Sequence, residues 1–260
     1  MRFSTSRLIF IASLALLAAP VFTHAQQAEK APRIGFLGAT SESDYRAQFE
    51  AFRQGLRDLG YVEGKNLIIE SRWADGHYER LPVLVAELVG LPVDLLVTHG
   101  TPGTRAAKRA TTTIPIVMAN SGDAVATGLI ASLAQPGGNV TGSTFFSPEI
   151  TAKGLELLKE AMPRIRRVAV LVNPDNSEKE LGLQTMALTA RSLKLELYPF
   201  EARGPREFES AFAAMANQRV HALEIQQDAM LIGNARELAA LAAKSRLPSR
   251  GSRNSHKLAA

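Results

Sequence analysis

The chain contains no cysteine among its 260 residues. It therefore cannot form a disulfide, a thiolate zinc site, an iron–sulfur cluster or a cysteine nucleophile, and it lacks the cysteine that a lipoprotein anchor needs. The composition is otherwise ordinary, with 46% hydrophobic and 21% charged residues. These values exclude disorder, a collagen helix and a coiled coil as descriptions of the whole chain.

The common enzyme motifs are also absent. The sequence has no GxGxxG dinucleotide fingerprint, no HExxH zinc motif and no GxSxG nucleophile elbow. Residues 60–66 (GYVEGKN) approach a phosphate-binding loop, but the spacing is one residue short and the segment ends in Asn. We therefore predict a protein that is not an enzyme and that has no catalytic residue, no bound metal and no cofactor.

The charge balance is basic but dispersed. Thirty basic and 25 acidic residues give a formal net charge of +5, and the Lys and Arg residues are spread along the chain. A nucleic-acid-binding domain usually clusters its basic residues on one face. We therefore interpret the charge as a solvated surface and expect no nucleic-acid partner.

Residues 1–25 have the pattern of an export signal. Arg2 and Arg7 precede a run of twelve apolar residues at 8–19, Pro20 follows, and the segment ends in small residues at Ala25. The run is too short to cross about 30 Å of hydrocarbon, which argues against a membrane anchor. We predict a secretory signal peptide over 1–25 and a polar lead-in over 26–32.

The rest of the chain alternates apolar runs with amphipathic segments. Strands are expected at 33–37, 66–71, 93–98, 114–119, 167–172, 195–200 and 222–226, with a further short strand after 135–142. Helices are expected at 45–59, 79–89, 101–110, 124–133, 149–162, 178–193, 205–217 and 229–245. Strands that are apolar throughout, each followed by a helix, predict an α/β protein with parallel sheets covered on both faces.

The loops that follow these strands are the candidate ligand site, because ligands of open parallel sheets bind beyond the carboxyl ends of the strands. Thr101 and Pro102 have the pattern of a helix start, and free amides at such a start suit a carboxylate. Asp123 either pairs with a ligand amine or only caps a turn. His99 ends a strand alone, where a structural role is more common than ligand contact. Trp73 and Tyr78 either stack on a ligand or pack at an edge.

Four stretches resemble the type I periplasmic substrate-binding proteins of ABC importers, and among them the tryptophan and tyrosine binders. They are 33–41 (RIGFLGATS), 52–76, the long and specific 98–142, and 167–176 (RVAVLVNPDN). The resemblance runs from about residue 33 to about residue 249. It implies a two-lobed type I periplasmic binding protein fold, in which each lobe is a parallel sheet flanked by helices and the lobes close on a small solute.

The strand–helix pattern breaks and restarts near residues 142–150, which marks the boundary between the lobes, and the resemblance implies the site residues. The N-terminal lobe is expected at 33–145 and the C-terminal lobe at 146–248. The ligand-binding residues implied for the first lobe are Thr40, Ser41, Thr98, Gly100, Thr101, Ser121 and Asp123. Those implied for the second lobe are Asn173, Asp175 and Gln226.

The function implied is that of a periplasmic or otherwise extracytoplasmic receptor, a monomer that delivers an amino-acid-like ligand to an ABC permease in the membrane. Amides near Thr101 would hold a carboxylate, and Asp123 would hold an amine. The alternatives are a receptor domain that presents its ligand to a membrane sensor, a non-functional truncated paralogue, and an exported α/β enzyme.

Residues 249–260 (SRGSRNSHKLAA) depart from the pattern. Family members continue well beyond this point with further strands, whereas this tail has no apolar run and is not expected to form the parallel strand due after the last helix. We therefore expect a C-terminal lobe that is incomplete, with its C-terminal strands missing through truncation or a frameshifted reading. Uncovered sheet edges would make such a chain unstable or a poor binder.

Overall fold

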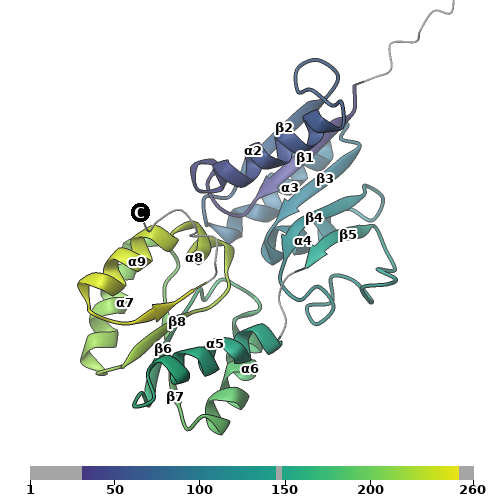
Figure 1. The fold of residues 1–260 in the computed structure, drawn as a ribbon. Coiled ribbons are helices and arrows are strands. Elements are labelled where there is room, and N and C mark those ends of the chain that lie inside the picture. Colours follow the sequence, from purple (N-terminus) through teal and green to yellow (C-terminus); the bar gives the residue numbers. More distant parts are fainter. Residues whose placement is uncertain (1–30, 145–147, 252–260) are drawn as a thin grey trace, which may run out of the picture. The chain divides into compact units, whose positions relative to one another are not determined.

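A computed structural model describes residues 31–144 and 148–251 (Figure 1). The predicted signal peptide and most of the lead-in lie outside these residues, and so do positions 145–147, where the boundary between the lobes is expected. Within the described part of the chain, no helix has both the length and the apolar character that a membrane crossing requires.

The first sheet contains five parallel strands in the order β2-β1-β3-β4-β5. The strands are β1 (Arg33–Gly38), β2 (Ile68–Trp73), β3 (Leu95–His99), β4 (Ile116–Ser121) and β5 (Val140–Thr144). The connecting helices are α2 (Glu42–Asp58), the short 3₁₀ helix η1 (Tyr78–Arg80), α3 (Leu81–Gly90) and α4 (Thr101–Ala110). Each expected strand of this half forms, shifted by at most two or three residues.

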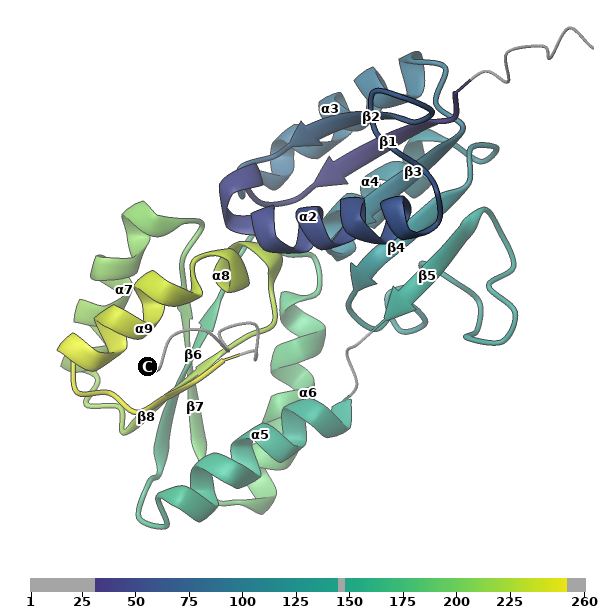
Figure 2. The ribbon, with the colours of Figure 1, turned by 45° about the horizontal axis from the view of Figure 1, so that its top comes forward.

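Alternation along β1 explains how the helices divide between the two faces of this sheet. Phe36 packs with Phe49 of α2, whereas the next residue, Leu37, packs with the apolar residues of α3, including Leu88. Successive side chains of a strand point to opposite faces, so a strand that carries apolar residues on both faces needs a helix on each side. The ribbon shows α2 on one side of the sheet and α3 and α4 on the other (Figure 2).

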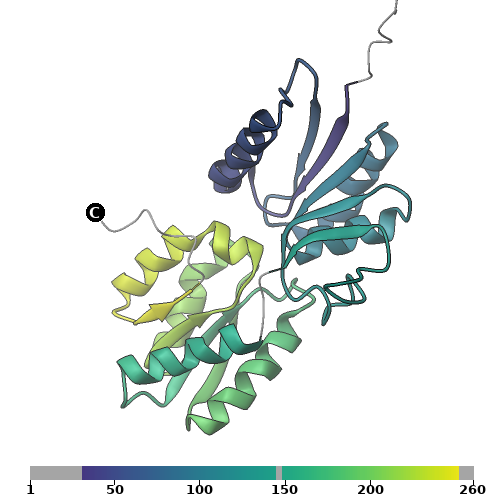
Figure 3. The ribbon, with the colours of Figure 1, turned by 45° about the vertical axis from the view of Figure 1, so that its right-hand side comes forward.

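The second sheet is parallel, with the order β7-β6-β8-β9. Its strands are β6 (Arg167–Val172), β7 (Glu196–Glu201), β8 (Ala222–Ile225) and β9 (Ser249–Arg250). Its helices are α5 (Pro148–Ala161), α6 (Lys179–Ser192), α7 (Pro205–Asn217), α8 (Ala229–Gly233) and α9 (Ala235–Lys244), and Figure 3 gives a further view of them. Val170 faces α5 and α6, and Leu171 faces α7 and α9. The architecture is the predicted α/β arrangement of parallel sheets flanked by helices.

The helix expected over 124–133 does not form. Asp123 starts a single helical turn, in which the Thr127 amide donates to the Asp123 carbonyl at 2.9 Å. Gly128 then adopts φ 70°, and the Leu129 amide donates to the Ala124 carbonyl at 2.9 Å. This pattern is a Schellman motif, which ends a helix at a left-handed glycine. The prediction was wrong because it followed the spacing of the apolar residues over 124–133 and did not take Gly128 as the end of the helix.

The single helix expected over 229–245 is two helices. Asn234 stands between α8 and α9 with φ −99° and ψ 19°, and its side-chain amide donates to the Met230 carbonyl at 2.9 Å. Gly233 comes so close to the first sheet that a Cβ there would lie 3.2 Å from Thr40 Cγ2. The break therefore lets α8 approach the loop after β1.

The tail also differs from expectation. Ser249 and Arg250 form β9, a short strand that pairs with β8 in parallel, although we expected no strand here. The strand has no apolar side chain to bury, and Arg250 instead forms an ion pair with Glu224, a buried residue of β8. Residues 252–260 of the expected tail lie outside the described residues.

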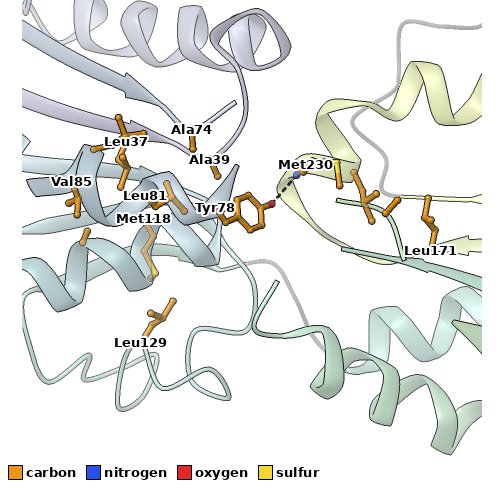
Figure 4. Close-up of a cluster of buried hydrophobic side chains, with 14 of the residues drawn as sticks. Leu37, Ala39, Ala74, Tyr78, Leu81, Val85, Met118, Leu129, Leu171 and Met230 are labelled. Atoms are coloured by element: carbon orange, nitrogen blue, oxygen red, sulfur yellow. Dashed lines mark hydrogen bonds between the residues drawn. The ribbon is translucent and has the colours of Figure 1, made fainter. Parts of the chain in front are cut away.

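One layer of buried side chains connects the two sheets. It contains Leu37 and Leu81 beside the first sheet and Leu171 and Met230 beside the second (Figure 4). Tyr78 of η1 reaches across, and its hydroxyl accepts a hydrogen bond of 3.0 Å from the Met230 amide.

Candidate functional site

A cavity of about 210 Å³ is lined by segments that follow the carboxyl ends of strands in both sheets. From the first sheet these are the residues after β1, β3 and β4, and from the second sheet the residues after β6 and β8. Helix α2 and the α8–α9 break complete the lining. This is the place where open parallel sheets bind ligands.

We call the side of the cavity that belongs to the first sheet the first wall, and the side that belongs to the second sheet the second wall. The first wall is built around the start of α4. Gly100 precedes this helix with φ 77°, a left-handed conformation that glycine adopts without strain. Gly100 has no side chain that could cap the helix, so the free N–H groups of the first turn, which exclude Pro102, and the positive end of the helix dipole lie beside the cavity that Gly100 and Thr101 line. The Thr101 hydroxyl accepts from the Gly122 amide at 2.8 Å and lies 2.9 Å from Ser121 Oγ. These bonds fix the loop after β4 against α4.

Asp123 combines the two roles considered for it. Its Oδ1 accepts from the amides of Val125 and Ala126 at 3.2 and 2.9 Å, so this oxygen caps the turn that follows. The carboxylate also lines the cavity. Capping therefore orients Asp123 without removing it from the site.

An aromatic pair forms another part of the first wall. The rings of Tyr45 from α2 and His99 from β3 lie 3.9 Å apart between centroids. Burial lowers the pKa of His99 to about 4, so the imidazole is neutral at neutral pH. Its Nδ1 is buried and has no hydrogen-bond partner in the described protein.

The second wall contributes Glu178, Gln226 and Gln227. Burial raises the pKa of Glu178 to about 7, and the Thr101 hydroxyl and the Arg105 guanidinium act in the opposite direction. Arg105 Nη2 lies 4.0 Å from Glu178 Oε1, beyond hydrogen-bond distance. The Gln226 amide is oriented by a 3.1 Å hydrogen bond from its Nε2 to the Lys179 carbonyl.

Asp228 is at the edge of the same wall, but both of its carboxylate oxygens already accept hydrogen bonds from the protein. Its carboxylate accepts from Tyr78 Oη at 2.9 Å, Asn176 Nδ2 at 3.0 Å and Asn173 Nδ2 at 3.3 Å. It also accepts from the Leu231 amide at 3.0 Å and so caps α8. Burial raises the pKa of Asp228, while these hydrogen bonds favour the ionised form. Its role is to connect the elements around the cavity.

Half of the residues implied by the resemblance line the cavity. They are Thr40, Gly100, Thr101, Asp123 and Gln226. The other five do not line it, and each has a structural contact instead. Ser41 caps α2, Thr98 bonds to the Thr104 hydroxyl, Ser121 supports Thr101, Asn173 supports Asp228, and Asp175 forms a surface ion pair with Arg203. Trp73 packs against Phe36, also outside the lining.

Several lining residues were not predicted. Asp44, Tyr45 and Gln48 lie on one face of α2, and Arg236 follows the unpredicted break between α8 and α9. These α2 residues directly follow the loop after β1 and have the three- and four-residue spacing of one helix face. They could therefore have been predicted from the sequence. Glu178 and Asp228 stand in or next to the predicted loops. In the described ranges, no three His, Asp or Glu side chains are grouped so that they could hold a metal ion.

Comparison with known proteins agrees with this architecture. Residues 39–256 match the family described as ABC transporter substrate binding protein. A tyrosine-binding protein of Clostridioides difficile is 26% identical over 200 residues, which cover 76% of this chain and 57% of that protein. The chain thus spans less than two thirds of the length of this curated relative.

Two solved structures extend the comparison. A conserved domain protein from Vibrio cholerae is 27% identical with a TM-score of 0.78, covering 87% of this chain and 76% of that one. A Streptococcus pneumoniae ABC domain in complex with L-Trp has a TM-score of 0.75 at 22% identity, covering 86% and 74%. The second likeness concerns the fold alone. Since the family match covers most of the chain, this protein belongs to the ABC transporter substrate-binding protein family.

Proposed function

We propose that the protein is a non-catalytic, extracytoplasmic receptor that binds a small amino-acid-like solute and delivers it to the permease of an ABC importer. The observation that carries this proposal is the cavity lined by the carboxyl-end segments of both sheets. A ligand held by two walls stabilises the arrangement in which both contact it, which is the basis of hinge closure in such receptors.

The chemistry of the first wall supports an amino-acid backbone as the part that is recognised there. The first amides of α4, around Thr101, suit the α-carboxylate, and the Asp123 carboxylate suits the α-ammonium. The names of the relatives are consistent with this chemistry, because one binds tyrosine and another holds L-Trp. The proposal covers residues Thr40, Gly100, Thr101, Asp123 and Gln226 as ligand contacts.

The cellular role is part of the same proposal. Residues 1–25 would export the chain, and the receptor would act as a monomer outside the cytoplasm. Membership of the family supports an ABC permease as the partner. Capture of a permease by the tagged protein, and of no sensor kinase or chemoreceptor, is the expected result of a membrane pull-down.

The direct test is a binding screen of the purified full chain. The twenty standard L-amino acids are scored by the increase in melting temperature, and each hit is titrated by calorimetry. Binding of at least one amino acid, with no chemical change in the recovered ligand, is expected. If the L-amino acids all fail to bind while another class of solute binds, the ligand class proposed here is wrong.

A further inference from the structure

The second wall contains three buried hydrogen-bond acceptors that have no donor among the described residues. Glu178 Oε1, Gln226 Oε1 and Gln227 Oε1 are buried, and none has a hydrogen-bond partner in the described protein. Gln226 is 5% exposed, and its Nε2 is committed to the Lys179 carbonyl, so its oxygen is the end left free. All three residues line the cavity. Buried acceptors without donors are unfavourable, so this wall suits a ligand that brings N–H groups.

The local structure keeps space for these acceptors. Gly182 of α6 lies so close to Gln226 Nε2 that a Cβ would overlap it, and a Cβ on Gly122 would lie 2.7 Å from Glu178 Oε2. Glycine at both positions therefore lets the Gln226 and Glu178 side chains occupy their places in the wall. The positions of Gln226 and Glu178 in the second wall therefore depend on the absence of a side chain at Gly182 and Gly122.

The charge of the site has the opposite sign to that of the whole chain. The lining contains the carboxylates of Asp44, Asp123, Glu178 and Asp228 and the guanidinium of Arg236, and Arg105 lies beside Glu178. Four acidic groups, counted as ionised, against two basic groups give the site a formal charge of −2, and it stays anionic when Glu178 is partly protonated, within a chain of formal charge +5. Such a site attracts cations, and the α-ammonium of an amino acid, balanced by its own carboxylate, does not neutralise it.

We infer that the second wall binds a cationic nitrogen group on the ligand side chain, so that the solute is an amino acid with an ammonium or guanidinium side chain. Glu178 supplies the countercharge, and Gln226 and Gln227 accept the remaining N–H groups. This inference rests on the proposed function, in which the first wall holds the α-carboxylate and α-ammonium.

Binding of a cation at Glu178 has a consequence for protons. Asp123 and Asp228 raise the pKa of Glu178 together with burial, whereas Thr101 and Arg105 lower it. With a pKa of about 7, this carboxyl is partly protonated at neutral pH. A ligand cation favours the ionised form, so binding releases protons near pH 7 and the affinity rises as the pH rises through 7.

The test is calorimetric titration of the full chain with L-arginine and L-lysine, each paired with a neutral ligand of similar shape, L-citrulline and L-norleucine. The cationic member of a pair should bind about tenfold more tightly or better. Glu178→Gln should abolish that difference. Glu180→Gln, which removes the same charge from an exposed position of α6, should preserve it. Proton release, measured in buffers of different ionisation enthalpy, is an independent readout if Glu178→Gln does not fold.

The outcomes separate this inference from the proposed function. Binding of L-tryptophan or L-tyrosine with no preference for a cationic side chain overturns the inference and leaves the proposed function intact. Equal losses in Glu178→Gln and Glu180→Gln, or binding without proton release at pH 7, also overturn it. Absence of binding to every amino acid overturns both.

Discussion

The Tyr78 hydroxyl donates to the Asp228 carboxylate at 2.9 Å across 150 residues of sequence. The same oxygen accepts from the Met230 amide at 3.0 Å, so one hydroxyl satisfies two buried groups beside the second sheet. Tyr78 belongs to η1, the 3₁₀ helix that follows β2 of the first sheet, and the bond therefore holds α8 and its cap against that half.

We expect Tyr78→Phe to lower the free energy of unfolding by about 1–3 kcal/mol, because Asp228 loses a donor and the Met230 amide loses its acceptor in a buried site. Urea denaturation gives the value. Tyr198→Phe is the matched control, since its hydroxyl makes an exposed bond to Glu196 at 2.8 Å and its loss should have little effect. Equal stability of the two variants would contradict the assignment.

A second prediction concerns two glycines with opposite surroundings. Gly142 of β5 has φ 130°, and a Cβ there would lie 2.6 Å from the Met118 amide nitrogen in β4. Gly142→Ala should therefore destabilise the protein by about 2 kcal/mol or more. Gly55, inside α2, has open space around it, so Gly55→Ala should stabilise by about 0.5–1 kcal/mol. The melting temperatures of both variants test this, and a change of the same sign in both would contradict the prediction.

Thr98 and Thr101 separate structural from binding roles. The Thr98 hydroxyl bonds to the buried Thr104 hydroxyl at 2.8 Å, away from the cavity lining. Thr98→Val should cost about 1 kcal/mol of stability and change ligand affinity less than twofold. Thr101→Val removes the acceptor of the Gly122 amide from the cavity wall, so the affinity should fall about tenfold. Calorimetry with any hit of the binding screen compares them, and a larger loss of affinity in Thr98→Val would reverse these roles.

The fourth prediction is a pH dependence of stability. Burial raises the pKa of Glu224 to about 7, although its ion pair with Arg250 acts against this. The folded chain thus holds more protons on Glu224 than the unfolded chain between about pH 4.5 and 7, and this contribution to stability decreases as the pH rises through that window. His99, with its pKa lowered to about 4, changes stability in the opposite direction over an overlapping range.

Because the two effects oppose each other, the informative quantity is the difference between Glu224→Gln and the unaltered protein. The variant should become relatively more stable as the pH rises from 4.5 to 7, since it lacks the carboxyl that is costly to ionise. Urea denaturation at pH 5 and pH 7.5 measures this. A difference that does not change with pH would show that Glu224 titrates normally.

The local elements were predictable where the boundary signals were strong. Helix α4 begins at Thr101 with Pro102 next to it and forms over the predicted range, as do β6 and α7. The break at Asn234 was not predictable, because it depends on how closely Gly233 approaches the first sheet. Strand β9 was missed for a similar reason, since the Arg250 ion pair with Glu224 needs the assembled sheet.

The site was predictable as a set of loops but less so as individual side chains. The rule that ligands bind beyond strand ends located Gly100, Thr101 and Asp123 on the lining. It could not tell that Thr98 and Ser121 point to neighbouring hydroxyls. Those orientations depend on which of two alternating faces each strand residue takes, and the sheets are covered on both.

The buried layer that contains Leu37, Tyr78 and Met230 belongs to both sheets, so we expect the two halves to unfold as a single cooperative unit. Unfolding one half would expose apolar surface on the other, so both halves should melt in one transition. A single transition of this kind would count against the expectation that the chain is unstable. Ligand binding at the cavity then raises the melting temperature of the whole molecule by mass action. A single fluorescence or calorimetric trace is therefore a sufficient reporter of occupancy.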